Sequence, residues 1–380
     1  MGHHDPAGLV EDQVTGSCQV SQALRDRLGI SAGLPRELRH LWCAPRLRER
    51  AIYRQPQVLV VHRESIFAAL VAELTPVRSP SGQPGEVNVH AAWRLAVARR
   101  AAQVYARNGK LAALTAAGSV GTGLADRFSD LELDCYWLRA PDGLDRAGPV
   151  DALGGELTEL WDYDHDEQEW SEEYRIGELG VTVSNFLAGT IEVFLDDVIL
   201  RVDTDPVKHM RLAALQRSRP LVGGELVASW RARASEFPGT LVSALVARSL
   251  APPVLTGWAA REALVSRGDD LAVQDLLARA GQAVVRVVLA LNRVYVPHPL
   301  LKWQRHLITG LEVAPRQLGE RLEMISAGRP AEALRAAEAL LADTLLLAEA
   351  HTDADISSFR EALAERRRPI DPPPPVPSGP

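Results

Sequence analysis

The feature that most constrains this chain is a segment in which acidic residues alternate with leucines shortly after a glycine-serine pair. It runs from Gly118 to Asp134 and ends in Asp130-Leu131-Glu132-Leu133-Asp134. Because side chains of a strand alternate between its faces, the pattern predicts a strand with three carboxylates on one face and leucines in the core. Carboxylates crowded together repel one another unless a cation lies among them. Magnesium takes carboxylate oxygens together with substrate phosphates, so we expect Asp130 and Glu132 to be its ligands.

The loop before this strand predicts a phosphate site. Gly118 and Ser119 follow an apolar, strand-like run at 111–117, and Gly121 lies shortly after them. Such a loop offers free backbone N–H groups, which suit a phosphate, although glycine also serves in ordinary tight turns. The segment is not a dinucleotide fingerprint, because the third glycine is missing, nor a P-loop, which needs Gly-Lys-Ser/Thr.

Composition and charge narrow the class of protein. The formal net charge is −7, so nucleic acid is not expected as a partner. The three cysteines have no Cys-x-x-Cys spacing, which argues against a disulfide framework or a structural zinc site and fits a reducing compartment. We find no signal-peptide pattern and no apolar run of roughly 18 residues. The expectation is a soluble, cytoplasmic protein without a membrane segment.

The order of predicted elements indicates an α+β domain followed by an all-helical region. A helix at 89–107 with Asn88 as its N-cap precedes strands at 111–117 and 131–138. A hairpin follows, with strands at 169–175 and 180–186, and then a helix at 190–201 capped by Thr190. After residue 224 the chain reads as helix, with the longest segments at 271–294 and 330–350. The acidic run at 162–169 is interpreted as a solvent-facing loop.

These elements predict four parts of the chain. They are an N-terminal extension, partly irregular, at 1–85, an α+β domain at 86–215, a helical domain at 216–368 and a Pro-rich disordered tail at 369–380.

The spacing of the central motif resembles the signature of the nucleotidyltransferase superfamily. Gly118-Ser119, ten residues and then Asp130-Leu131-Glu132 are similar to the pattern in DNA polymerase beta and aminoglycoside nucleotidyltransferases. The segment Leu291-Asn292-Arg293-Val294-Tyr295-Val296-Pro297, followed by Lys302-Trp303, resembles the helical domain of a bacterial group that fuses such a domain to a nucleotidyltransferase domain. The resemblance covers roughly residues 90–350 and implies a small mixed sheet with helices.

The resemblance also implies a reaction. Asp130 and Glu132 would hold Mg2+ against a nucleoside triphosphate, with ATP the expected one. Ser119 and the backbone from Gly118 to Gly121 would bind its β- and γ-phosphates. A hydroxyl of a small acceptor, such as an aminoglycoside-like compound, would attack the α-phosphorus and release pyrophosphate.

Three cations complete the predicted nucleotide-binding set: Arg127, Lys208 and Lys302. The alternatives remain open, since Lys208 also reads as a surface lysine and Lys302 as part of a structural pair beside Trp303. Asp134 is interpreted either as a further acid of the site or as a structural residue that pairs with Arg127.

One position departs from the superfamily pattern. A third acid is expected on a later strand, and this chain has Val181-Thr182-Val183 there. Either Asp134, Glu178 or Glu192 compensates for Thr182, or the activity is weakened or altered. The alternative function is therefore a catalytically degenerate nucleotidyltransferase fold that acts as a nucleotide-binding regulator or antitoxin-like partner.

Overall fold

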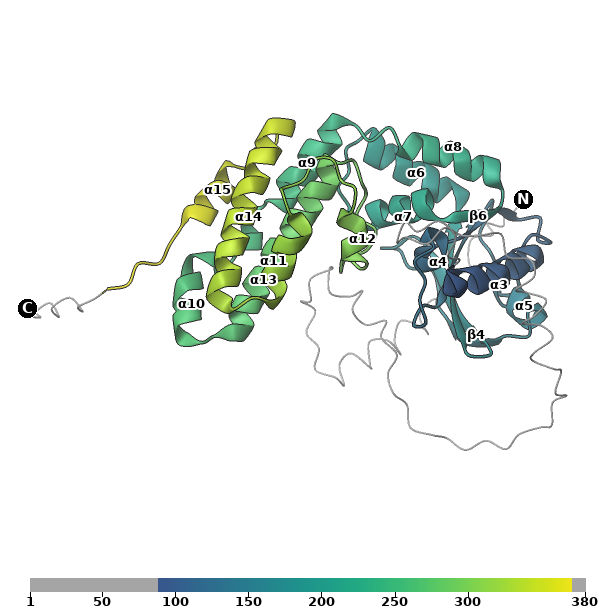
Figure 1. Ribbon diagram of the computed structural model, residues 1–380. Coiled ribbons are helices and arrows are strands. Elements are labelled where there is room, and N and C mark those ends of the chain that lie inside the picture. The colour runs from purple at the N-terminus through teal and green to yellow at the C-terminus, as the bar shows by residue number, and fades with distance from the viewer. Residues whose placement is uncertain (1–87, 371–380) are drawn as a thin grey trace, which may run out of the picture. The chain divides into compact units, whose positions relative to one another are not determined.

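The computed structural model describes residues 88–370 of the 380-residue chain (Figure 1). The predicted N-terminal extension at 1–85 and the predicted tail from residue 371 onward lie outside the described residues. All elements below belong to one compact unit by their contacts.

The first half of the described chain forms a six-stranded mixed sheet in the order β3-β4-β5-β2-β1-β6. The parallel pair is β2 with β5, and the other neighbours are antiparallel. This confirms the α+β fold class, with helices that follow the sheet. The strands are β1 (Leu111–Ala116), β2 (Leu131–Trp137), β3 (Glu156–Leu160), β4 (Trp170–Ile176), β5 (Leu179–Leu187) and β6 (Arg219–Val222).

The alternation of acids and leucines folds as predicted. Leu131 and Leu133 are buried below the sheet, while Glu132 is exposed on the opposite face. The predicted hairpin is confirmed as β4 and β5. The strand β3 was not predicted, because all five of its residues are exposed and it carries no apolar period.

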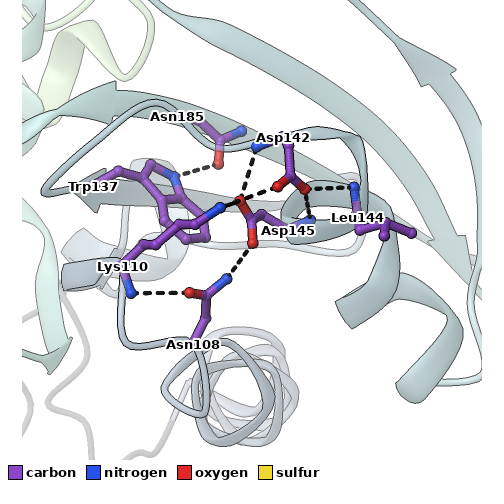
Figure 2. A network of polar contacts seen from close by, with 7 residues as sticks. All are labelled: Asn108, Lys110, Trp137, Asp142, Leu144, Asp145 and Asn185. Carbon is purple, nitrogen blue, oxygen red and sulfur yellow. Dashed lines mark hydrogen bonds and ion pairs between the residues drawn. The ribbon is translucent and has the colours of Figure 1, made fainter.

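Helices α3 (Val89–Tyr105) and α5 (Gly143–Ala152) pack on the leucine face of the sheet. Asn88 caps α3 as predicted and accepts hydrogen bonds from the backbone N–H groups of His90 and Ala91. Helix α5 begins with a capping box formed by Asp142 and Asp145. Lys110 forms ion pairs with both aspartates, which ties the start of β1 to α5 (Figure 2).

Helices α6 (Ala188–Ile199), α7 (Pro206–Arg217) and α8 (Gly224–Ala234) cover the other face where it is apolar. There Tyr136 stacks on Phe186, and Trp230 of α8 meets Tyr136 edge-on with ring centroids 5.2 Å apart. The prediction that Thr190 caps α6 is wrong: α6 begins at Ala188, and the preceding Leu187 offers no side-chain cap.

The rest of the described chain is helical, as predicted, and its buried residues continue the same apolar core. Helices α11 and α14 have 22 residues each. The elements are α9 (Gly239–Ser249), η2 (Pro252–Leu255), η3 (Trp258–Ala260), α10 (Arg261–Arg267), α11 (Asp270–Leu291), α12 (Gln304–Ile308), α13 (Leu318–Ala327), α14 (Pro330–His351) and α15 (Ser357–Ala364). The domain division at 215/216 stays a prediction, and β6, which pairs with β1, lies C-terminal to it.

Across residues 88–370, no single helix is both long and apolar enough to cross a membrane. The segments Gly239–Leu255 and Trp258–Arg267, bent by 49° at a short break, meet that test of length and composition only as a pair.

Candidate functional site

The two predicted acids stand at the start of β2, directly beside the glycine-serine segment. A Cβ atom on Gly118 would lie 2.5 Å from both Cδ and Oε1 of Glu132, so the carboxylate rests against the backbone of this glycine. Gly118 also has a φ of 54°, in the left-handed region that favours glycine. The structure therefore places the predicted phosphate segment and the predicted metal ligand in direct contact.

The predicted loop is a short helix, α4 (Gly118–Thr122). The backbone N–H groups of Gly118 and Ser119 stand in its first turn, where no intrahelical acceptor exists. Gly121 differs from the prediction, because its N–H donates to the carbonyl of Ala117 at 2.8 Å. A Cβ at Gly121 would lie 2.6 Å from the carbonyl oxygen of Ala116. Close packing of α4 on β1 thus explains this glycine, and its N–H is already used.

The chain between α4 and Asp130 is held by α3. The side-chain amide of Asn88 donates to the carbonyls of Gly123 and Ala125 at 2.8 and 3.0 Å. Arg94 of α3 donates from Nε to the carbonyl of Ser129, the residue before Asp130, at 2.8 Å. These bonds fix the position at which the chain enters β2.

Charged groups from distant segments surround Glu132. Although the side chain reaches solvent, the protein packed around its carboxyl group raises the pKa of that group by desolvation, and the charge of Asp130 raises it further. Lys302 and Arg211 act in the opposite direction and lower this pKa. The charge of Lys302, from the helical region, therefore acts on Glu132, and its contact with a nucleotide stays a prediction.

The segment around Lys302 has an unusual backbone. Its two neighbours, Leu301 and Trp303, have φ values of 50° and 60°, which non-glycine residues rarely adopt. Strained positions of this kind often accompany functional sites. Trp303 also lines a pocket of about 600 Å³, together with Leu124, which follows α4, and residues of α12 and α13.

A buried charge cluster lies two residues along β2. Asp134 is only 6% exposed, and burial raises the pKa of its carboxyl group to about 7. The cation that opposes it is Arg211 of α7, which forms ion pairs with Glu169 at 2.9 Å and Glu167 at 3.3 Å. The predicted pairing of Asp134 with Arg127 is wrong, since Arg127 is exposed and lies over the ring of Phe128.

Salt bridges bear on two further predictions. The acidic run at 162–169 is not wholly solvent-facing, because Glu169 is buried and pairs with Arg211. Lys208 forms ion pairs with Asp197 at 2.5 Å and Asp203 at 2.7 Å. Its ammonium is thus held between the end of α6 and the start of α7, and its triphosphate contact stays a prediction.

The register of the sheet places Thr182 directly opposite Glu132 on the parallel neighbour β5. The alignment that put threonine in the place of the third acid is therefore consistent with the strand pairing. Of the acids named as substitutes, Glu178 is exposed and pairs with Arg175, and Glu192 pairs with Arg233 and accepts from Trp230. Sequence reasoning missed Glu173, which lies opposite Thr182 on β4.

The donor chemistry of Asp130 and Glu132 fits a magnesium ion, which binds through one or two carboxylates and takes its other ligands from water and phosphate. The absence of a side chain at Gly118 lets the Glu132 carboxylate lie directly against the backbone of this turn. Over residues 88–370, no group of three or more His, Cys, Asp or Glu side chains is arranged to hold a metal ion by itself. A site here would therefore depend on substrate oxygens.

The chain was compared with protein families, curated proteins and solved structures. A family described as a domain of unknown function (DUF4037) matches residues 206–304, about a quarter of the chain. No curated protein matches the chain. Among solved structures, a nucleotidyltransferase-like protein from Exiguobacterium sibiricum 255-15 is similar, with 16% identity and a TM-score of 0.33 over 72% of this chain and 81% of that one. A TM-score of this size does not establish a shared fold.

Proposed function

We propose that this protein is a magnesium-dependent nucleotidyltransferase that moves a nucleoside monophosphate from a triphosphate, with ATP as the expected donor, to a hydroxyl of a small molecule. The observation that carries the proposal is the contact between Gly118 and Glu132. It joins the proposed phosphate-binding turn to the proposed metal ligand within one site. A fold that needed only a tight turn at Gly118 would not need a carboxylate against its backbone.

The residues of the site would have separate roles in binding the metal ion and the triphosphate. Asp130 and Glu132 would hold the metal ion, and the backbone N–H groups of Gly118 and Ser119 would bind the β- and γ-phosphates. The bound ion would neutralise charge on the triphosphate and on the departing pyrophosphate. Lys302 would add positive charge to the site, in keeping with its lowering of the pKa of Glu132.

The transfer itself would be an in-line displacement. The acceptor oxygen would form a bond to the α-phosphorus, the bond from that phosphorus to the bridging oxygen would break, and pyrophosphate would leave. Positioning and electrostatic stabilisation supply most of the catalysis in such reactions, so fixed entry of the chain into β2 matters. The hydrogen bonds from Asn88 and Arg94 provide that rigidity.

A second candidate is a nucleotide-binding regulator with a degenerate site. Thr182 favours it, because a threonine opposite Glu132 is neither a carboxylate ligand nor a carboxylate base. In that case nucleotide and magnesium would bind without turnover.

Pyrophosphate release separates the two candidates. The purified full chain would be incubated with magnesium, each of the four ribonucleoside triphosphates and a panel of aminoglycosides and other polyols. The transferase proposal predicts release that Asp130→Asn abolishes and that an exposed control, Glu178→Gln, leaves unchanged. Magnesium-dependent nucleotide binding without release over the whole panel would instead support the regulator.

A further inference from the structure

The face of the sheet that carries Glu132 holds a second, unassigned carboxylate. Glu132 on β2 is opposite Thr182 on β5, and Thr182 is opposite Glu173 on β4. Directly opposed residues of neighbouring strands project to the same face. The three side chains therefore form one row, with the threonine in the middle. Since neighbouring strands lie about 4.8 Å apart, the backbones of Glu132 and Glu173 are separated by about 10 Å.

The electrostatic surroundings of Glu173 link it to the site. Burial raises the pKa of its carboxyl group, and the charges of Glu159 on β3 and of Asp130 raise it further. No cation contributes to this shift. The basic residue two positions along β4, Arg175, pairs instead with Glu178 at 3.6 Å. Glu173 is thus a partly buried carboxylate whose surroundings favour the uptake of a proton.

We infer that Glu173 is the general base of the proposed transfer, supplied from β4 because β5 carries a threonine. This rests on the proposed function. In the step, the acceptor oxygen bonds to the α-phosphorus as its proton passes to a carboxylate oxygen of Glu173. The electron pair of the broken phosphorus–oxygen bond leaves with pyrophosphate. Thr182, short and uncharged, lies beneath the space between the metal-binding acids and this base.

A role as base is preferred over a role as third metal ligand for a geometric reason. Glu173 is one strand further from Glu132 than the expected third acid, and in the part of the chain that the structure covers no three potential ligands are close enough to hold one ion. A general base needs to reach only the acceptor hydroxyl. Glu178 and Glu192, with their own arginine partners, are poorer candidates.

The decisive variant is Glu173→Gln, which keeps the shape of the side chain and removes its basicity. We expect kcat to fall by about 100-fold or more, with magnesium-dependent nucleotide binding, measured by calorimetry, changed by less than about twofold. Glu156→Gln is the matched control, because Glu156 is also an exposed glutamate of β3 but lies opposite Arg175 rather than Glu173. Its kcat is expected to stay within about twofold of the wild type.

A rescue tests the role of position within the row. Thr182→Asp in the Glu173→Gln background moves a carboxylate to β5, and we expect it to recover kcat by about tenfold or more.

Melting temperatures check that each variant is folded. An unchanged kcat in Glu173→Gln, or an equal loss of kcat and nucleotide binding, would overturn the assignment while the proposed function stands. If the wild type binds magnesium and nucleotide but never turns over, both the transferase proposal and the base are rejected. If it does not bind nucleotide at all, the site is rejected as well.

Discussion

The Glu132 carboxylate lies against the backbone of Gly118, so close that any side chain at position 118 would collide with it. Two segments separated by more than ten residues are thereby fixed to each other. The carboxylate is the end of a flexible side chain and can turn away, but any other residue at position 118 would also have to adopt the φ of 54°.

The first prediction concerns Gly118. Gly118→Ala places a Cβ 2.5 Å from the Glu132 carboxylate at a φ of 54°. We expect the free energy of unfolding to fall by about 1–3 kcal/mol, as chemical denaturation would measure. Nucleotide binding should weaken in parallel, because the carboxylate is displaced.

Two further variants complete this test. Gly143→Ala is the control, because a Cβ at Gly143 meets nothing within 4 Å. Glu132→Ala combined with Gly118→Ala should destabilise less than the sum of the single changes, since the collision is gone. Additive effects would show that the two residues are not coupled.

The second prediction concerns the dependence of stability on pH. Burial raises the pKa of Asp134 from 3.8 to about 7, so the folded protein binds a proton more tightly than the unfolded chain. The contribution of Asp134 to stability is then greatest below about pH 4 and is lost as the pH rises through 7. Asp134→Asn should therefore gain stability relative to wild type between pH 4 and 8, by up to roughly 4 kcal/mol.

Denaturation of wild type and Asp134→Asn across this range measures the effect. Glu172 titrates in the same window, because burial raises its pKa also to about 7, and its contribution is common to both proteins. Glu178→Gln, at an exposed position, provides the control. A difference between wild type and Asp134→Asn that stays constant with pH would contradict the account.

The third prediction concerns Arg211. Arg211→Met removes the cation that opposes the buried Glu169 and Asp134, and breaking a buried pair in this way costs about 3–5 kcal/mol. Arg175→Met removes an exposed arginine of a loose pair and should cost less than about 1 kcal/mol. Thermal unfolding compares the two variants, and equal losses would show that Arg211 has no special role.

The fourth prediction concerns Lys302. If the ammonium group of Lys302 binds the triphosphate, Lys302→Ala should weaken nucleotide binding by about 5- to 30-fold, or about 1–2 kcal/mol. The loss should shrink at high salt, because salt screens exposed charges. Arg335→Ala, at an exposed position on α14, is the control for charge alone. If Lys302→Ala and Arg335→Ala bound nucleotide with similar affinity, Lys302 would not belong to the nucleotide-binding site.

Local patterns of the sequence were enough to predict the main elements around the site. The alternation at 130–134 predicted β2 and the face of each side chain, and Asn88 predicted the start of α3. Both signals act over a few residues. The hairpin of β4 and β5 was likewise predicted from two short strand-like segments joined near Gly177 and Gly180.

The missed features depend on contacts between distant segments. Arg211 lies 77 positions after Asp134, and no local pattern links the two. The sequence indicated that Glu169 belongs to a solvent-facing acidic run, but in the structure it pairs with Arg211. The position of Glu173 follows from the register between β4 and β5. A slip of one residue in this register would turn Glu173 to the other face of the sheet.

The most direct test of the central claim is a crystal structure of the full chain with manganese and a non-hydrolysable analogue of ATP. The anomalous signal of manganese locates the ion independently of the protein density. We predict a peak within coordination distance of carboxylate oxygens of Asp130 and Glu132, with the β- and γ-phosphates at the backbone N–H groups of Gly118 and Ser119. An ordered nucleotide and ion bound elsewhere, with Glu132 still against Gly118, would contradict the account.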